Sequence, residues 1–157
     1  MTINEVVESK KIDFSDIPAS YYLIGLLSAF ENRFQALADS QMKEISWKQF
    51  FLIICISRCE QAPTINELSE IVGSSHQNVK QLLLKLQTKD FVELYVDETD
   101  RRKQRVKLTK HCMDFCEQND AMSTNVMNEM FEGISDDDLL TTIKTISLIE
   151  ANLSNIK

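Results

Sequence analysis

The sequence predicts a mainly α-helical fold of the α+β class, in which helices surround one small β-hairpin. Two short runs with strand character, 91–96 and 104–108, flank a charged turn. Directly before them, residues 74–89 form an amphipathic stretch with helical spacing. A helix followed by a basic hairpin is the arrangement of a winged helix-turn-helix. Long helical patterns at both chain ends add flanking helices that we expect to form a dimer.

Length and composition are those of a single globular domain. The chain has 157 residues, 43% of them hydrophobic. No apolar run reaches the roughly 18 residues that a membrane-spanning helix needs, so we expect no membrane partner. The first residues lack the apolar core of a signal peptide, and a cytoplasmic protein is expected. Residues 1–16 are predicted to form a flexible arm.

The first long helix is expected from about residue 18 to residue 41. Ser15 or Asp16 is expected to cap it, with Pro18 in the first turn, where a missing N–H costs nothing. Its apolar side chains recur at helical spacing, at Tyr22, Leu26, Ala29, Phe30, Phe34 and Leu37.

Two capping boxes predict where the next helices begin. Ser46 with Gln49, and Thr64 with Glu67, fit the pattern in which each side chain bonds the other residue's backbone amide. Gly73 can end the second of these helices in a left-handed conformation. This glycine would then lie in the turn of a helix-turn-helix.

The helix after that turn is expected to read DNA. An apolar stripe predicted to face the core consists of Val79, Leu82, Leu83 and Leu86. The opposite side is polar; glutamine and asparagine can form two hydrogen bonds to adenine, and serine and histidine can bond bases or phosphates. For a helix considered alone, a solvated polar surface is the alternative interpretation. The predicted contacts are Ser74, Ser75, His76, Gln77, Asn78, Lys80 and Gln81.

The hairpin and the segment around it are basic, although the whole chain is acidic. The formal net charge is −7, yet residues 74–110 hold 9 Lys and Arg against 5 Asp and Glu, a local net charge of +4. One face can therefore attract phosphates while the rest repels them, although part of it could merely be solvated. The predicted wing contacts are Arg101, Arg102, Lys103 and Arg105, of which Arg101 and Lys103 are the better candidates for phosphate or the minor groove.

Two helices are predicted after the hairpin. Thr109 is expected to cap a helix to about residue 131, ended by Gly133, and Ser135 is expected to cap the last one. The last helix repeats apolar side chains at Leu139, Ile143, Ile146, Leu153 and Ile156. We assign residues 17–44 and 109–157 to dimerisation and residues 45–108 to the DNA-binding winged helix.

The ordered motifs resemble the MarR family of transcription regulators. The family pattern at the wing is Asp-x-Arg followed by Leu-Thr, here Asp100, Arg102, Leu108 and Thr109. Upstream, 45–57, 64–73 and 73–94 fit the family's helices before the wing, so the resemblance covers about residues 45–109 and the flanking helices by pattern only. The chain departs from the pattern at three positions. Asp90 and Cys112 stand where the family usually has glycine, and Leu84 where a polar residue is usual.

The resemblance implies a homodimer that binds a palindromic operator in double-stranded DNA. It implies that Asp100 and Arg102 brace the wing by a salt bridge. It also implies that small phenolic or lipophilic effectors bind between the first, second and fifth helices. Aromatic residues that could line such a pocket, each otherwise an ordinary core residue, are Tyr21, Tyr22, Trp47, Phe51 and Phe115.

The four cysteines form two pairs with i, i+4 spacing, Cys55 with Cys59 and Cys112 with Cys116. Buried, reduced thiols are the favoured interpretation for such residues in a cytosolic protein. A redox role and a metal role both stay open, although zinc sites usually have tighter spacing on loops. We expect no metal and no cofactor.

The predicted function is a dimeric DNA-binding transcription regulator, expected to repress, whose affinity responds to a small molecule or another signal. The sequence holds no catalytic motif, and the two histidines lie on different helices, so we expect no enzyme. Two alternatives stay open, a winged-helix module that binds protein and a thiol-based redox-sensing regulator. Strong salt dependence of DNA binding would favour the DNA-binding regulator.

Overall fold

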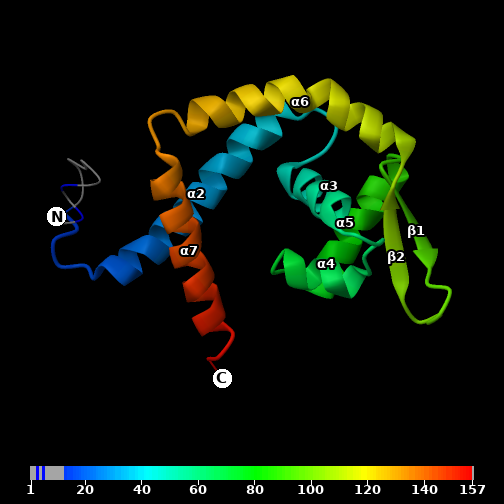
Figure 1. The fold of residues 1–157 in the computed structure, drawn as a ribbon, viewed down its shortest axis with the longest axis horizontal. Coiled ribbons are helices and arrows are strands. Elements are labelled where there is room, and N and C mark those ends of the chain that lie inside the picture. Colours follow the sequence, from blue (N-terminus) through cyan, green and yellow to red (C-terminus); the bar gives the residue numbers. More distant parts are fainter. Residues whose placement is uncertain (1–2, 4, 6–12, 157) are drawn as a thin grey trace. The chain divides into compact units, whose positions relative to one another are not determined.

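A computed structural model describes residues 3, 5 and 13–156 of the chain (Figure 1). Within them lie six helices and one hairpin, as predicted. The predicted arm falls largely outside the described residues. The elements are α2 Ala19–Gln41, α3 Trp47–Arg58, α4 Ile65–Ile71, α5 His76–Thr88, β1 Val92–Val96, β2 Gln104–Leu108, α6 Lys110–Met130 and α7 Asp136–Leu153. The chain divides into two compact units, residues 1–112 and 113–157.

The predicted capping boxes are confirmed at α3 and α4. The Gln49 amide donates to Ser46 Oγ over 3.3 Å, and the Ser46 amide donates to Gln49 Oε1 over 3.0 Å. Thr64 and Glu67 form the same reciprocal pair at the start of α4. Each box satisfies two backbone amides that the first helical turn leaves free. The predicted caps at Thr109 and Ser135 are also confirmed, and Ser75 caps α5.

The predicted cap of α2 is wrong. The helix begins after Pro18, whose side chain can accept no hydrogen bond. Ser15 is instead drawn into a turn by Asp13, whose Oδ1 accepts from the Ser15 amide at 2.9 Å and from its hydroxyl at 2.7 Å. Pro18, with its fixed φ, therefore takes the N-cap position, and no side chain caps the helix.

Two helices of the first unit end in the same hydrogen-bonded motif. Gly73 follows α4 with φ 62°, and Asp90 follows α5 with φ 60°. After α5, the Asp90 amide donates to the Gln87 carbonyl and the Phe91 amide to the Leu86 carbonyl, each over 3.0 Å. This is a Schellman motif, which favours a left-handed residue at the position of Asp90. The departure from glycine noted at Asp90 therefore leaves the turn intact.

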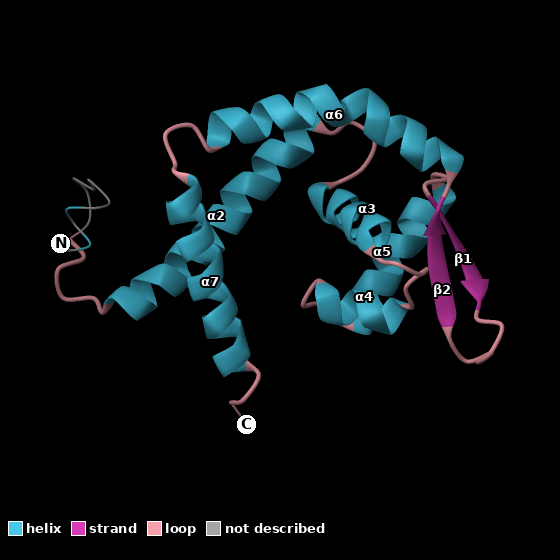
Figure 2. Cartoon of the chain, in the orientation of Figure 1, coloured by secondary structure: helices cyan, strands magenta, loops and turns pink. Residues whose placement is uncertain are grey.

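The core of the first unit lies where α3, α4 and α5 gather beside the hairpin (Figure 1). The predicted stripe of α5 faces it, because Val79, Leu83 and Leu86 are fully buried, whereas Leu82 is half-buried. The hairpin is the one sheet of the described chain, with β1 antiparallel to β2 and Leu94 opposite Val106 (Figure 2). The other fully buried side chains of this core include Leu52, Ile53, Leu68, Phe91, Val92 and Val106.

The flanking helices carry large apolar side chains that the described chain leaves exposed. On α2 only Ala38 is buried, and α7 has no buried residue in the described structure. The side chains most exposed on α2 and α7 are Tyr21, Ile24, Phe30, Leu140, Ile143, Leu148 and Leu153. None of the described helices is both long and apolar enough to cross a membrane.

Candidate nucleic-acid interface

The outer face of α5 carries polar residues that the sequence analysis predicted to contact DNA. Ser75, His76, Gln77, Lys80 and Gln81 are all exposed. Within the described chain the side chains of Gln77, Lys80 and Gln81 form no hydrogen bond or ion pair, so their donors and acceptors remain available. This availability is what base or phosphate contact requires.

The beginning of α5 is more constrained. Ser75 Oγ accepts from the Asn78 amide at 3.2 Å and caps the helix. Asn78 Nδ2 donates to Ser74 Oγ over 2.8 Å, and Ser74 is half-buried. Ser74, Ser75 and Asn78 therefore shape the start of the helix, and an outside acceptor would have to compete for the Asn78 amide group.

Asp97 organises the tip of the hairpin. Its Oδ1 accepts from the Thr99 hydroxyl at 2.6 Å and from the Thr99 and Asp100 amides at 2.8 Å each. Its Oδ2 accepts from Arg105 Nε. The Thr99 hydroxyl and the Arg105 guanidinium hold the pKa of Asp97 well below its usual range. The sequence analysis gave Asp97 no role, although an aspartate two residues before a threonine is typical of such turns.

Arg105 joins the hairpin to the segment that precedes α4. Besides Asp97, its guanidinium donates from Nη1 to the Ala62 carbonyl. Next to it, the Val106 amide donates to the Pro63 carbonyl over 3.0 Å, and Thr64 forms a bridge with Arg105. Arg105 was predicted to contact DNA, yet the structure gives its guanidinium two partners inside the protein. Its geometry is that of a residue that positions the wing.

The three basic residues of the tip differ in their partners. Arg102 pairs with Asp100 through two contacts, Nε to Oδ1 at 3.1 Å and Nη2 to Oδ2 at 3.3 Å. This is the ion pair that the resemblance implied, and the Arg102 side chain lowers the pKa of Asp100. Lys103 lies 4.0 Å from the same carboxylate. Arg101 is exposed and forms no ion pair with a described carboxylate, so its charge is fully available.

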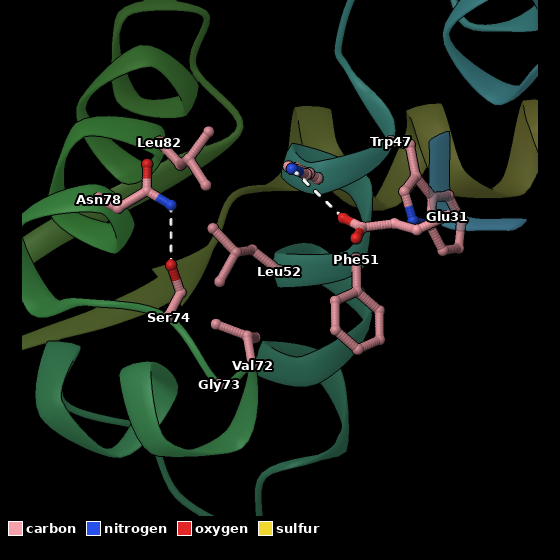
Figure 3. Close-up of a pocket in the computed structure, with 10 residues that line it drawn as sticks. Glu31, Trp47, Phe51, Leu52, Val72, Gly73, Ser74, Asn78 and Leu82 are labelled. Carbon is pink, nitrogen blue, oxygen red and sulfur yellow. Dashed lines mark hydrogen bonds and ion pairs between the residues drawn. The ribbon is translucent and has the colours of Figure 1, made fainter. Parts of the chain in front are cut away.

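A pocket of about 360 Å³ opens between α2, α3 and the turn that precedes α5 (Figure 3). Trp47 and Phe51 stack along one side, with ring centroids 6.0 Å apart. Lys48 Nζ lies 3.5 Å from Glu31 Oε1 and adds a charged pair. Its other lining residues come from α3, the turn and α5, namely Leu52, Val72, Gly73, Ser74, Asn78 and Leu82.

The five aromatic residues proposed for an effector site occupy different surroundings. Only Trp47 and Phe51 line this pocket. Tyr21 is 76% exposed on α2, and Tyr22 packs edge-on against Phe14 at 4.7 Å between centroids. Phe115 is half-buried in the second unit. Spacing along the sequence did not indicate Glu31 or Lys48, since their pairing depends on how α2 meets α3.

The four cysteines are thiols rather than disulfides. Burial, and then the neighbouring Cys59, raises the pKa of the Cys55 thiol, as expected for an apolar helix. Cys112, which stands where the family usually has glycine, is fully buried in the first turn of α6. Among the described residues, no group of three or more potential metal ligands occurs.

Solved structures share this architecture, although no family model matches the chain. A MarR/EmrR family transcriptional regulator from Acinetobacter has 14% identity and a TM-score of 0.77, over 89% of this chain and 100% of its own. A mutant MarR from E. coli complexed with operator DNA has 23% identity and a TM-score of 0.71, over 88% and 99% of the two chains. The chain has the fold of MarR-family regulators. The PcaV regulator from Streptomyces coelicolor, in complex with its natural ligand, has 14% identity and a TM-score of 0.72, over 91% and 98%.

The resemblance drawn from the wing motif is thereby confirmed for the fold. In this MarR-like fold, α5 occupies the position of the second helix of the helix-turn-helix, and β1 with β2 forms the wing. The proteins named above are transcriptional regulators, and one of them is complexed with operator DNA.

Proposed function

We propose that the protein is a dimeric transcription regulator that binds a palindromic operator in double-stranded DNA and acts without enzymatic chemistry in the cytoplasm. The observation that carries the proposal is the unpaired polar face of α5 beside a basic wing on an otherwise acidic chain. A basic cluster on an otherwise acidic chain attracts an anionic partner to this one face. The E. coli MarR complexed with operator DNA shares this fold and supports DNA as that partner.

The contacts divide into two classes. On α5, Gln77 and Gln81 are proposed to read base edges, and Lys80 to bind backbone phosphate. On the wing, Arg101 and Lys103 are proposed to bind phosphate or enter the minor groove. Arg105 is proposed to position the wing, because both of its contacts are internal.

A second copy of the chain is the proposed partner of the exposed apolar side chains on α2 and α7. Exposed apolar groups of this size and number mark an interaction surface. A two-fold dimer would place the two winged helices, one from each subunit, on half-sites about 10 base pairs apart. Such an arrangement requires a palindromic operator. Sedimentation equilibrium tests this: a monomer at micromolar concentration would contradict it.

The pocket beside Trp47 is the proposed effector site. Its aromatic side suits a small phenolic or lipophilic compound, the paired Lys48 and Glu31 can bond a phenolic hydroxyl, and its lining reaches Ser74 and Asn78 at the start of α5. We infer that a ligand there favours a dimer in which the distance between the two winged helices no longer matches the spacing of the half-sites. A repressor would then leave the operator. Trp47 is the single tryptophan of the chain, so its fluorescence reports occupancy. Titration with 4-hydroxybenzoate and other phenolic acids tests the site, and Phe51→Ala, which removes one aromatic wall of the pocket, should weaken binding.

The DNA-binding proposal is tested by selecting bound fragments from the source genome. The expected result is one palindromic sequence bound about 10³-fold or more tightly than random DNA. Affinity should fall steeply as salt rises. Equal, weak binding to all fragments, together with capture of a protein through the same α5 and wing residues, would favour a protein-binding module instead.

A further inference from the structure

A small cavity of about 160 Å³ lies where α4, α5 and the wing meet. We call it the notch. Its walls come from three elements that are far apart in the sequence. The lining residues are Thr64, Ile65 and Asn66 at the start of α4, His76 and Lys80 on α5, and Arg102, Lys103 and Gln104 at the base of the wing tip.

The notch has the chemistry of an anion site. Lysine, arginine and histidine side chains reach it from two elements, and Asn66 and Gln104 add amide donors. None of its lining residues is acidic. The adjacent carboxylate of Glu67 already accepts from the Thr64 amide at 2.6 Å and from its hydroxyl at 2.9 Å. That bonding lowers the pKa of Glu67, and the charge of Glu67 also acts on Lys103. At the wing, the Asp100 carboxylate pairs with Arg102, which leaves Lys80 as the lining cation without an ion-pair partner among the described residues.

The fold holds the three walls in place. Arg105 donates to Asp97 inside the wing and to the Ala62 carbonyl outside it. The bond from the Val106 amide to the Pro63 carbonyl, at 3.0 Å, fixes β2 against the segment that enters α4. These bonds fix the backbone of β2, and with it the base of the wing, beside the start of α4. A site held in this way needs little reorganisation to bind an anion.

We propose that the notch binds one backbone phosphate of DNA in each half-site. The inference rests on the proposed function and deepens it. When a recognition helix enters the major groove and a wing reaches the groove's edge, the DNA strand between them passes the junction of helix and wing. A phosphate there accepts hydrogen bonds from several donors at once and fixes the register of the helix, without reading sequence. This assigns backbone contact to Asn66 and Gln104, which sequence reasoning did not identify.

The test is a scan of the selected operator in which each phosphate is replaced, one at a time, by a neutral methylphosphonate. Affinity is measured by fluorescence anisotropy with the full-length protein. One position in each half-site should weaken binding by about tenfold, as expected for a lost charge-assisted contact. In Lys80→Gln, replacing that same phosphate should weaken binding by a clearly smaller factor than in the wild type, because one of its charged partners has already been removed.

Lys85→Gln is the matched control, since Lys85 is exposed on the same helix and does not line the notch. It should keep the wild-type pattern at every position. Asn66→Ala should weaken operator and random DNA by the same factor of about three to ten. If the operator is bound but each methylphosphonate weakens binding by the same factor in the wild type and in Lys80→Gln, the notch binds no phosphate and the proposed function stands. If the unmodified operator is bound no more tightly than random DNA, both the phosphate site and the proposed function are wrong.

Discussion

Replacing Arg101 by alanine should weaken DNA binding and reduce the dependence of affinity on salt concentration. Arg101 is the cation at the wing tip that the described carboxylates leave unpaired. Arg102 is paired twice with Asp100, and Lys103 lies 4.0 Å from it. An unpaired guanidinium can bind a phosphate without first giving up an internal partner, so its removal should cost a full contact.

The size of the effect follows from counterion release. Each phosphate contact contributes about 0.9 to the slope of log affinity against log salt. A dimer with two wings would lose about 1.8. Between about 50 and 200 mM salt, the wild type should therefore lose roughly twelvefold more affinity than Arg101→Ala. The loss should be the same on the operator and on random duplexes, because phosphate contacts carry no sequence information.

The assay is fluorescence anisotropy on both duplexes across that salt range. Lys144→Ala is the charge-matched control, because Lys144 is exposed on α7, outside the predicted interface. It should leave the slope unchanged. A slope that is unchanged in Arg101→Ala as well as in Lys103→Ala would remove the wing from the interface. A loss confined to the operator would mean that Arg101 reads sequence.

Four further predictions follow from single residues. Gln77→Ala or Gln81→Ala should cost about 1–3 kcal/mol on the operator and little on random DNA in the same binding assay, whereas equal losses would mean that both residues only position the protein. Asp97→Asn should destabilise the protein in urea unfolding; because the folded pKa is depressed, the difference should be full above about pH 5 and shrink below about pH 4, and a difference independent of pH would contradict this. Asp90→Gly should raise the free energy of unfolding by about 0.5–1 kcal/mol, since the left-handed backbone at φ 60° favours glycine, and a lowered value would show that Asp90 makes a compensating contact. Mild peroxide should change DNA affinity by less than about twofold because Cys112 is buried; a tenfold loss that is reversed by reductant and absent in Cys112→Ser would establish a redox sensor.

Interactions between near neighbours in the chain could be predicted from the sequence. Each capping box joins residues three positions apart, so Ser46 with Gln49 and Thr64 with Glu67 were found from spacing alone. The ion pair of Asp100 with Arg102 is equally local. The buried stripe of α5 followed from helical periodicity. The motif order along the chain was enough to predict the shared fold.

The cap of α2 shows where local pattern is insufficient. Ser15 and Asp16 both had the right side-chain type and position. The backbone instead forms a turn in which the Ile17 amide donates to the Phe14 carbonyl over 3.1 Å, and the helix begins only at Ala19. The side-chain type shows that a residue can cap a helix. It does not show whether the backbone places that residue at the first turn.

The sequence by itself determined the elements, their order and the basic stretch that carries the wing. The tertiary structure decided which charges remain available. Arg105 bonds the Ala62 carbonyl, 43 residues away, and is thereby withdrawn from the outer surface. Lys48 pairs with Glu31 from another helix, and Asn66 lines the same cavity as Lys80 and Lys103 because β2 is held against the start of α4. Hydrogen bonds and ion pairs act over a few ångströms, so these partners could be identified only once the fold had brought distant segments together.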